Sequence, residues 1–399
     1  MMNKDNGQLS GKKIRLTIVT NNIYAFGGGE KWALELSKRL SGKFDIKIVN
    51  TYSKGEKVKK TRKELEEEYD LKSFEIIDLD SVQMKSSAFG KEEYVMRIPR
   101  LKSVISLFNI IKNSDVVYQV SLNPVVFSYS LIFSKSLGKK FIFGVHNPVF
   151  FKIFEGKGKS SGLLLSLLRQ VRFFHVINSS DFELVKKHFP KAKIYKISIF
   201  ITKNYLEPRS NNKEFVVLYV GRFAKDQKGI DILDKIVKKV ISKEDRIRFH
   251  MVGGGGDGEK IIYSLGDNYK KNVKVLGFVN EKKLDEEYKN ASLFILPSRY
   301  EGLPAVLIEA QTYGLPVVAF DVKGPSDIVR VKRQGTLIMP FNTENFADNI
   351  IEYFKYWKKN PSEYSKVKID ISNLIHIRYK AVKILRKMEK MISEIYSMH

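Results

Sequence analysis

The sequence predicts an α/β protein made of two Rossmann-like domains that face each other across a cleft. Three observations lead to this fold class. The chain has 399 residues, more than one ordinary hydrophobic core accommodates. Short apolar runs rich in β-branched residues alternate with segments of helical spacing, which is typical of βα units and parallel sheets. A polar segment at 207–214, EPRSNNKE, divides these units into two series and is the expected linker.

Each series is defined by its expected strands. The first comprises IRLTIVT (14–20), FDIKIVN (44–50), SFEIIDL (73–79), VVYQV (116–120), KFIFGVH (140–146), HVINSS (175–180) and KIYKIS (193–198). The second comprises FVVLYVG (215–221), RIRFHMVGGG (246–255), VKVLGFV (273–279), LFILPS (293–298), PVVAFD (316–321) and GTLIMP (335–340). Helical patterns lie between them, and the tail from about residue 344 is helical throughout. The expected domains are 1–206 and 207–375, followed by a C-terminal helix at 376–399.

The charge balance favours anionic partners. The chain holds 70 Lys and Arg against 44 Asp and Glu, a net charge of +26, and residues 1–203 hold 36 and 19 of these. Such a field attracts phosphates, nucleic acid or an acidic lipid surface, although solvated lysine-rich faces produce the same balance. The absence of cysteine excludes disulfides and thiolate sites.

The same composition suggests where the protein works. No apolar run approaches the roughly 18 residues of a membrane-spanning helix, and the polar N-terminus predicts no signal peptide. We therefore expect a cytoplasmic protein. Residues 112–203 hold 15 Lys and Arg but four acidic residues. Within them, Leu163, Leu164, Leu167, Leu168 and Val171 have helical spacing, which fits either a core-facing helix or a peripheral contact with the inner face of an anionic membrane.

The most informative stretch is LPSRYEGLPAVLIEAQTYGLPVVAF at 296–320. It predicts a strand, a loop carrying Glu301, a helix over 305–313 that carries Glu309, a stop at Gly314-Leu315-Pro316 and a further strand. Two carboxylates at different depths can each bind a different ring of one polyhydroxylated ligand. The backbone N–H groups that open the helix suit an anion.

This arrangement resembles the nucleotide-sugar site of the retaining glycosyltransferases of family 4, in the GT-B class. Their hallmark E-G-x-P-x-x-x-x-E-A, followed by G-x-P-V-V, is matched by Glu301-Gly302-Leu303-Pro304, Glu309-Ala310 and Gly314-Leu315-Pro316-Val317-Val318. The resemblance implies a GT-B fold whose last helix packs back on the N-terminal domain. It also implies retaining transfer of a hexose from a nucleoside diphosphate sugar to a hydroxyl of a lipid-linked or glycan acceptor.

Other stretches are similar to further elements of that family. NNIYAFGGGE places Gly28 and Gly29 where the family's G-G-x-E loop lines the cleft, with a plain tight turn as the alternative. Gly253 opens a glycine run expected beside the nucleotide base, although a flexible βα connection explains this run equally, and the backbone at Phe278 and Val279 is expected to contact that base. His146 ends a strand at the expected ligand edge and would contact the donor sugar.

The resemblance also assigns chemical roles. Arg222 and Lys228 resemble the family's G-R-x-x-x-x-K-G element, with one extra residue between them that makes Lys225 the alternative. These cations would hold the leaving diphosphate, Glu309 the ribose hydroxyls, and Glu301 with Gly302, Leu303 and Pro304 the donor sugar. His146 would assist Glu301, and no separate nucleophile is expected.

Neither a cofactor nor a metal is expected beyond the donor substrate. Asp78-Leu79-Asp80 has the form of a D-x-D metal motif, but that motif belongs to the other glycosyltransferase class.

Two rival functions remain. One is a GT-B-fold epimerase or phosphorylase, which the E-G-x-P signature disfavours. The other is a basic nucleic-acid-binding protein, which we do not expect because no RNA-binding fingerprint is present.

Overall fold

The computed structural model describes residues 13–25, 28–53, 56, 58, 60–69, 71–86, 94–120, 122–146, 154, 161–201 and 213–398. Most of the expected linker, residues 207–212, lies outside this part. So do Gly27 of the expected glycine loop and Asn147 and Pro148, which follow His146.

The chain divides into two compact units. Unit 1 comprises Met1–Ile177, Asp181–Ile197 and Val382–His399, and unit 2 comprises Asn178–Ser180 and Ser198–Ala381. The change from unit 1 to unit 2 thus falls at residue 198, earlier than the expected linker. The short segment Asn178–Ser180 also groups with the second unit, and the end of the chain groups with the first.

Unit 1 is built on an eight-stranded sheet in the order β4-β3-β2-β1-β5-β6-β7-β8. Its strands are β1 (Ile14–Thr20), β2 (Phe44–Tyr52), β3 (Glu75–Ser86), β4 (Tyr94–Pro99), β5 (Val116–Gln119), β6 (Lys140–Val145), β7 (Phe173–Val176) and β8 (Lys193–Lys196). The sheet is parallel as expected except at one edge, where β4 pairs antiparallel with β3. The sequence pattern did not indicate β4.

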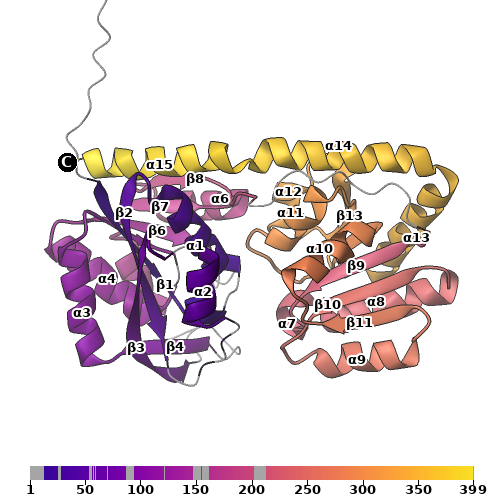
Figure 1. The fold of residues 1–399 in the computed structure, drawn as a ribbon, viewed down its shortest axis with the longest axis horizontal. Helices are drawn as coiled ribbons and strands as arrows, with labels where there is room; N and C mark the ends of the chain where they lie inside the picture. The colour runs from indigo at the N-terminus through magenta and orange to yellow at the C-terminus, as the bar shows by residue number, and fades with distance from the viewer. Residues whose placement is uncertain are drawn as a thin grey trace, which may run out of the picture. The chain divides into compact units, whose positions relative to one another are not determined.

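Helices cover both faces of this sheet (Figure 1). They are η1 (Ile23–Ala25), α1 (Gly28–Leu40), α2 (Arg62–Tyr69), α3 (Leu101–Lys112), α4 (Pro124–Ser136), α5 (Ser161–Leu168) and α6 (Ser179–His188). One buried cluster joins the sheet to α3, α4 and α5, with Leu107, Phe127 and Leu164 among its members. Leu164 and Leu168 thus face the core, as one of the two sequence alternatives expected, whereas Leu163 is 73% exposed.

Unit 2 has a six-stranded, parallel sheet in the order β11-β10-β9-β12-β13-β14. The strands are β9 (Val216–Gly221), β10 (Arg248–Gly253), β11 (Val273–Gly277), β12 (Leu293–Leu296), β13 (Val317–Phe320) and β14 (Gly335–Ile338). The chain builds outward from β9 to β11, then returns to the other side of β9 and builds outward again. The strand order therefore reverses between β9 and β12, and open α/β sheets bind ligands at such a point.

The helices of unit 2 pack on both faces of its sheet. They are α7 (Lys225–Lys228), α8 (Ile230–Lys243), α9 (Glu259–Asn268), α10 (Glu281–Asn290), α11 (Ala305–Thr312), α12 (Pro325–Ile328), η3 (Lys332–Gln334), α13 (Thr343–Lys359) and α14 (Pro361–Tyr379). Helices α8, α9 and α13 share one apolar cluster with the sheet.

The last helix, α15 (Ala381–Ser397), belongs almost wholly to unit 1. Glu389 pairs there with Lys43, and Glu394 pairs with Lys193. The break between α14 and α15 falls at Lys380, four residues beyond the expected start of the final helix. Among the helices of the described residues, none combines the length and the apolar character needed to cross a bilayer.

Candidate functional site

Two expected site residues meet where the strand order of unit 2 reverses. Lys228 ends α7, which follows β9, and Glu301 lies on the loop after β12. The Lys228 Nζ lies 2.6 Å from Glu301 Oε1, and the two side chains are only 14% and 6% exposed. The loops of neighbouring strands thus bring a cation and a carboxylate, distant in sequence, to the carboxyl edge of the sheet. This is the edge at which doubly wound sheets hold their ligands.

Gly229 makes this meeting possible. It has φ +66°, in the left-handed region, and a Cβ on it would lie 2.2 Å from the carbonyl oxygen of Pro297. Only glycine allows the end of α7 to pack so closely on the loop after β12. A second link joins the two loops, because the Arg299 N–H donates to the carbonyl of Gln227 at 2.8 Å. Arg299 also binds both carboxylate oxygens of Asp231.

The other expected cation, Arg222, is exposed just after β9. Its guanidinium donates to Gln227 Oε1 at 2.7 Å and forms no ion pair within the described part of the chain. Tyr219 anchors the backbone there by donating to the Arg222 carbonyl at 2.8 Å. Lys225, the alternative to Lys228, opens α7, where its N–H binds Asp257. Of the two lysines, the structure therefore places Lys228 against Glu301.

The loop from Glu301 to Pro304 is buried over all four residues. Ser298 donates to the same Glu301 oxygen that Lys228 contacts, at 2.7 Å. The Gly302 carbonyl accepts a bond from Asn178 Nδ2 at 3.2 Å, within unit 2. A Cβ on Gly324, which has φ +99°, would lie 2.6 Å from that carbonyl oxygen. The loop is thus fixed by side chains and backbone before any ligand binds.

Glu309 lies within α11, one helical turn after its start. Its carboxylate accepts a bond from the Tyr288 hydroxyl at 3.3 Å, and the Tyr288 ring stacks on Tyr313 at 5.1 Å between centroids. Burial is the main cause that raises the pKa of the Tyr288 hydroxyl well above its usual range, and Glu309 adds to it. Tyr288 therefore stays a hydrogen-bond donor that orients Glu309.

The expected base-binding segments also lie together. Gly253 ends β10 with φ +134°, and a Cβ on it would lie 1.9 Å from the Gly221 carbonyl oxygen. Phe278, 64% exposed, follows β11. Its ring lies over the glycine run, since a Cβ on Gly254 would be 2.8 Å from Cε2 of that ring. Val279 is half-buried. An exposed aromatic ring beside a glycine run is a type of surface on which nucleotide bases stack.

In unit 1, the half-buried His146 packs among the buried side chains of Trp32, Tyr118 and His175. Its Nε2 lies 3.2 Å from the Tyr118 hydroxyl and 3.1 Å from His175 Nδ1. The Tyr118 hydroxyl lies 2.5 Å from the same His175 nitrogen, and the Trp32 ring packs edge-on against His146. Burial, followed by the neighbouring His175, lowers the pKa of His146 well below its usual value. His146 is therefore neutral at pH 7 and able to donate or accept a hydrogen bond.

The remaining expected positions in unit 1 have ordinary surroundings. Gly28 and Gly29 open α1, are exposed, and a Cβ on either would meet nothing within 4 Å. Their neighbours in unit 1 therefore do not require glycine. Asp78 accepts bonds from Tyr24 and Asn50, and Asp80 pairs with Arg100. Within the described residues, no cluster of His, Asp and Glu is arranged to hold a metal.

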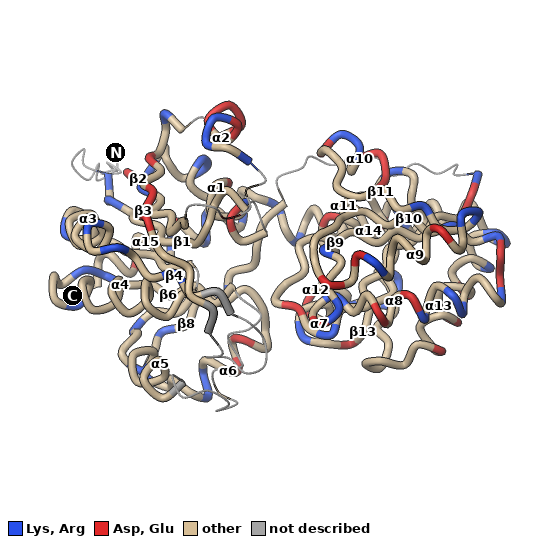
Figure 2. The backbone as a smooth tube through the Cα atoms, turned by 90° about the horizontal axis from the view of Figure 1, so that it is seen from below, with Lys and Arg blue, Asp and Glu red and all other residues tan. Residues whose placement is uncertain are grey.

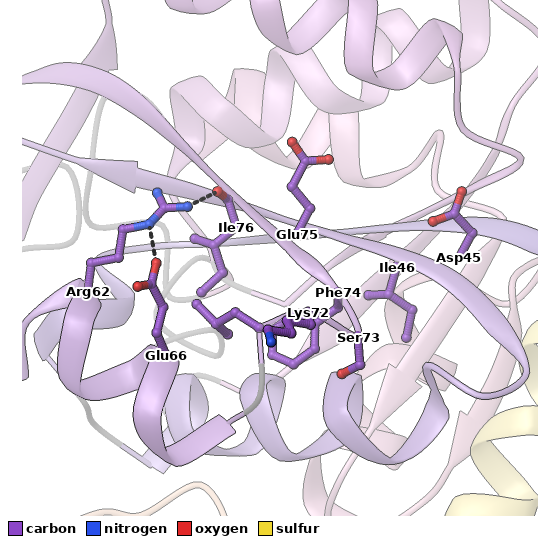
Figure 3. Close-up of a pocket in the computed structure, with 10 residues that line it drawn as sticks. Asp45, Ile46, Arg62, Glu66, Lys72, Ser73, Phe74, Glu75 and Ile76 are labelled. Carbon is purple, nitrogen blue, oxygen red and sulfur yellow. Dashed lines mark hydrogen bonds and ion pairs between the residues drawn. The ribbon is translucent and has the colours of Figure 1, made fainter.

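One pocket of unit 1 lies away from these residues (Figure 3). It has a volume of about 550 Å³ and lies at the amino ends of β2 and β3, opposite the expected ligand edge. Arg62 on its wall already binds Glu66 at 3.1 Å and the Ile76 carbonyl at 3.3 Å. We therefore do not assign the donor to this pocket.

Sequence reasoning missed the residues that position the expected ones: Ser298, Asn178, Gln227, Tyr288, Tyr118, His175 and Trp32. Ser298 and Gln227 lie next to the motifs and could have been found by their proximity. His175 offered a signal as well, because it lies in an expected strand of the same sheet as His146.

Comparison with known proteins shows which chains this one is similar to. Residues 202–367 match the family described as glycosyl transferases group 1. The poly(ribitol-phosphate) alpha-N-acetylglucosaminyltransferase of Staphylococcus aureus is 31% identical over 203 residues, which are 50% of this chain and 38% of that protein. The alpha-galactosylglucosyldiacylglycerol synthase of Streptococcus pneumoniae is 25% identical over 237 residues, 55% and 60% of the two chains.

The glycosyltransferase resemblance is confirmed. A mutant of S. aureus TarM, solved with fondaparinux, alpha-GlcNAc-glycerol and UDP, has a TM-score of 0.71 at 15% identity and covers 97% of this chain and 100% of that one. Anabaena HepE in complex with UDP has a TM-score of 0.73 at 14% identity, with 96% and 100% covered. The chain therefore has the GT-B fold, with two Rossmann-like domains. Membership of family 4 in particular stays a prediction.

Proposed function

We propose that the protein is a retaining glycosyltransferase that moves a hexose from a nucleoside diphosphate sugar to a hydroxyl of a lipid-linked or glycan acceptor. The observation that carries this proposal is the buried pair of Lys228 and Glu301 at the reversal of strand order. It unites the two motifs that resemble the donor site of these enzymes. Lys228 reaches toward the carboxylate expected to hold the sugar, at the edge where the diphosphate would lie.

The proposed chemistry needs few side chains. The bond between the anomeric carbon and the diphosphate oxygen breaks, and that oxygen takes the electron pair. Arg222 and Lys228 stabilise the charge that develops on it. The acceptor hydroxyl attacks from the same face, its oxygen bonds to the anomeric carbon, and its proton passes to the leaving phosphate. Glu301 holds sugar hydroxyls, Glu309 holds the ribose, and neutral His146 contacts the sugar.

The acceptor class rests on the relatives. Their names describe transfer to a ribitol phosphate polymer and synthesis of a glycosylated diacylglycerol. This chain spans less than two thirds of either of them, so the acceptor is proposed by analogy. We further propose that the enzyme works in the cytoplasm, at the inner face of the membrane, without a metal. An epimerase or phosphorylase of the same fold is the alternative that product analysis would separate.

Donor binding is the first test. Calorimetry with UDP and the other nucleoside diphosphates should give binding that Arg222→Ala and Glu309→Ala each weaken tenfold or more, because hydrogen bonds to charged groups contribute roughly 1.5–3 kcal/mol. Glu301→Ala should impair use of the sugar more than binding of the diphosphate. The exposed residues Arg333 and Glu352 supply matched controls, Arg333→Ala and Glu352→Ala. Unchanged affinity in both Arg222→Ala and Glu309→Ala would refute the site.

Stereochemistry is the second test. NMR of the product should show the anomeric configuration of the donor, and transfer should continue in the presence of a chelator. An inverted anomer would refute the proposed mechanism. Loss of transfer on chelation would direct attention to Asp78 and Asp80. Release of a free epimerised nucleotide sugar, or a requirement for inorganic phosphate, would favour the alternative enzymes.

A further inference from the structure

One helical layer of unit 1 is basic and almost free of acidic residues. Residues 101–140 and 161–172, which supply α3, α4 and α5, hold seven Lys and Arg and a single carboxylate, Asp115. That carboxylate forms an ion pair with the guanidinium of Arg15, at 2.6 Å. Figure 2 shows blue positions on α3 and α4, whereas α5 itself carries no Lys or Arg and is followed by Arg169 and Arg172.

At the edge of this layer the cations surround a pocket of about 230 Å³. Lys135, Lys139, Lys140 and Arg172 line it, with apolar walls from Leu131, Phe141, Val171 and Phe173. Among the described residues, no acidic side chain lines it. Lys135 donates to Gln170 at 2.7 Å, and none of the four cations forms an ion pair within the described residues. The pocket of Figure 3 differs, because Asp45, Glu66 and Glu75 line it beside its cations.

Large apolar side chains are exposed on the same helices. Leu101 and Ile105 of α3 are 75% and 53% exposed, Ile132 of α4 is 50% exposed, and Leu163 of α5 is 73% exposed. Ile132 lies one turn before Lys135, which lines the pocket. A cationic pocket beside exposed leucine and isoleucine fits a ligand that carries both a phosphate and an apolar chain.

We propose that the outer surface of α3, α4 and α5, which we call the basic helical face, docks on an anionic bilayer and that the pocket at Lys139 and Arg172 holds a lipid phosphate. A bilayer is the occupant that uses both features, because free phosphate would leave the apolar side chains in water. Guanidinium and ammonium groups bind a phosphate that lies between them. The inference builds on the proposed membrane-borne acceptor, but docking requires neither donor nor transfer.

The experiment is co-sedimentation of the full chain with vesicles, without donor or acceptor. The wild type should bind phosphatidylglycerol-containing vesicles at low salt and not pure phosphatidylcholine. Lys139→Gln with Arg172→Gln should reduce binding roughly 25-fold, since each basic residue near an anionic surface contributes about fivefold. Lys139→Arg with Arg172→Lys, which keeps both charges, should retain it. Lys355→Gln with Lys359→Gln on α13 removes the same charge from unit 2 and should leave binding unchanged.

A second variant tests the apolar component. Ile132→Ser with Leu163→Ser changes no charge and should also weaken vesicle binding. If the α13 control lost as much vesicle binding as the Lys139 and Arg172 variant, net charge alone would drive binding. That result would overturn the proposed docking at the basic helical face. Wild-type binding to soluble glycerol phosphate but not to vesicles would overturn the lipid source. The lipid source would also be overturned if Lys139→Gln with Arg172→Gln lost binding to an oligonucleotide but kept binding to vesicles. None of these results would affect the donor-binding test, so the two proposals fail separately.

Discussion

Lys228 and Glu301 form a buried ion pair although 73 positions of sequence separate them. Removing one partner of such a pair leaves the other charge without compensation, which typically costs about 3–5 kcal/mol. Lys228→Met and Glu301→Gln should therefore each lower the free energy of unfolding by a few kcal/mol. The double variant should lose less than their sum, with a coupling energy on the order of 1–3 kcal/mol.

Urea unfolding of the four proteins measures this coupling. The pair of Lys238 and Asp234, whose lysine is 47% exposed, supplies the control. The double-mutant cycle of this control pair should give a coupling energy of less than about 1 kcal/mol, because solvent screens exposed pairs. Strict additivity at Lys228 and Glu301 would show that the two side chains do not depend on each other.

Acid should destabilise unit 1 through His175. Burial lowers the pKa of this imidazole to about 4, whereas in the unfolded chain it has its ordinary value of about 6.5. Its Nε2 lies 2.8 Å from the Ile197 carbonyl and donates to it, so the neutral ring accepts the Tyr118 hydroxyl at Nδ1. Between these two pKa values the unfolded state binds more protons. Stability is therefore retained above pH 6.5 and is lost as pH falls toward 4, by about 3 kcal/mol from this group.

His175→Gln should flatten that acid dependence while lowering stability at pH 7, where hydrogen bonds are lost. Unfolding at several pH values between 4 and 7 checks both parts. His188, exposed at the end of α6, provides the comparison: burial and the neighbouring Lys187 and Arg169 lower its pKa as well, and His188→Gln should reduce the slope less than His175→Gln does. An unchanged slope in His175→Gln would contradict the assignment.

The glycines of the two units should respond differently to alanine. At Gly253 the added Cβ would meet the Gly221 carbonyl oxygen at 1.9 Å, and φ is +134°. Gly253→Ala should therefore destabilise the fold by several kcal/mol. Gly28→Ala meets open space at the start of α1 and should leave stability unchanged or raise it by up to about 1 kcal/mol. Thermal unfolding compares them. A loss of transfer in a fully stable Gly28→Ala would support the predicted close approach of substrate.

Sequence patterns predicted the sheet of unit 2 better than the edge of unit 1. Each of its six strands lies within an expected run, because strands of a parallel sheet are buried on both faces and read as continuous apolar runs. Strand β4 was missed, since YVMRIP is short, contains an arginine and pairs only with β3 at an antiparallel edge.

For the candidate site, the sequence predicted positions along the chain but not the contacts between side chains. Motif spacing placed Arg222, Lys228 and Glu301 on the correct strand ends. It did not indicate that Asn178 would bind the Gly302 carbonyl 124 positions away, or that Tyr118 and His175 would enclose His146. Such contacts depend on the register of strands and on the segment Asn178–Ser180 grouping with unit 2, which local spacing does not encode.

Because Lys368 is buried in α14, the stability of unit 2 should rise at alkaline pH. Lys368 is 3% exposed, and burial lowers its pKa to about 8 from its ordinary 10.5. Its ammonium donates to the Ala291 carbonyl at 3.2 Å. At pH 7 the group is charged in both states, so the full cost of burying that charge, about 3 kcal/mol, is present. Between pH 8 and 10.5 the unfolded chain binds more protons, and stability from this group rises with pH.

Lys368→Met should therefore stabilise the protein at pH 7 by about 2 kcal/mol, after loss of one hydrogen bond worth about 1 kcal/mol. The advantage over the wild type should shrink as pH rises from 8 to 10. Lys366→Met, at an exposed position of the same helix, should show neither the gain nor the pH dependence. Urea unfolding of the three proteins at pH 7, 8, 9 and 10 decides the matter. If Lys368→Met is less stable than the wild type at pH 7, the hydrogen bond to Ala291 contributes more than the buried charge costs. Lys368 would then stabilise the packing of α14 against the residues before β12.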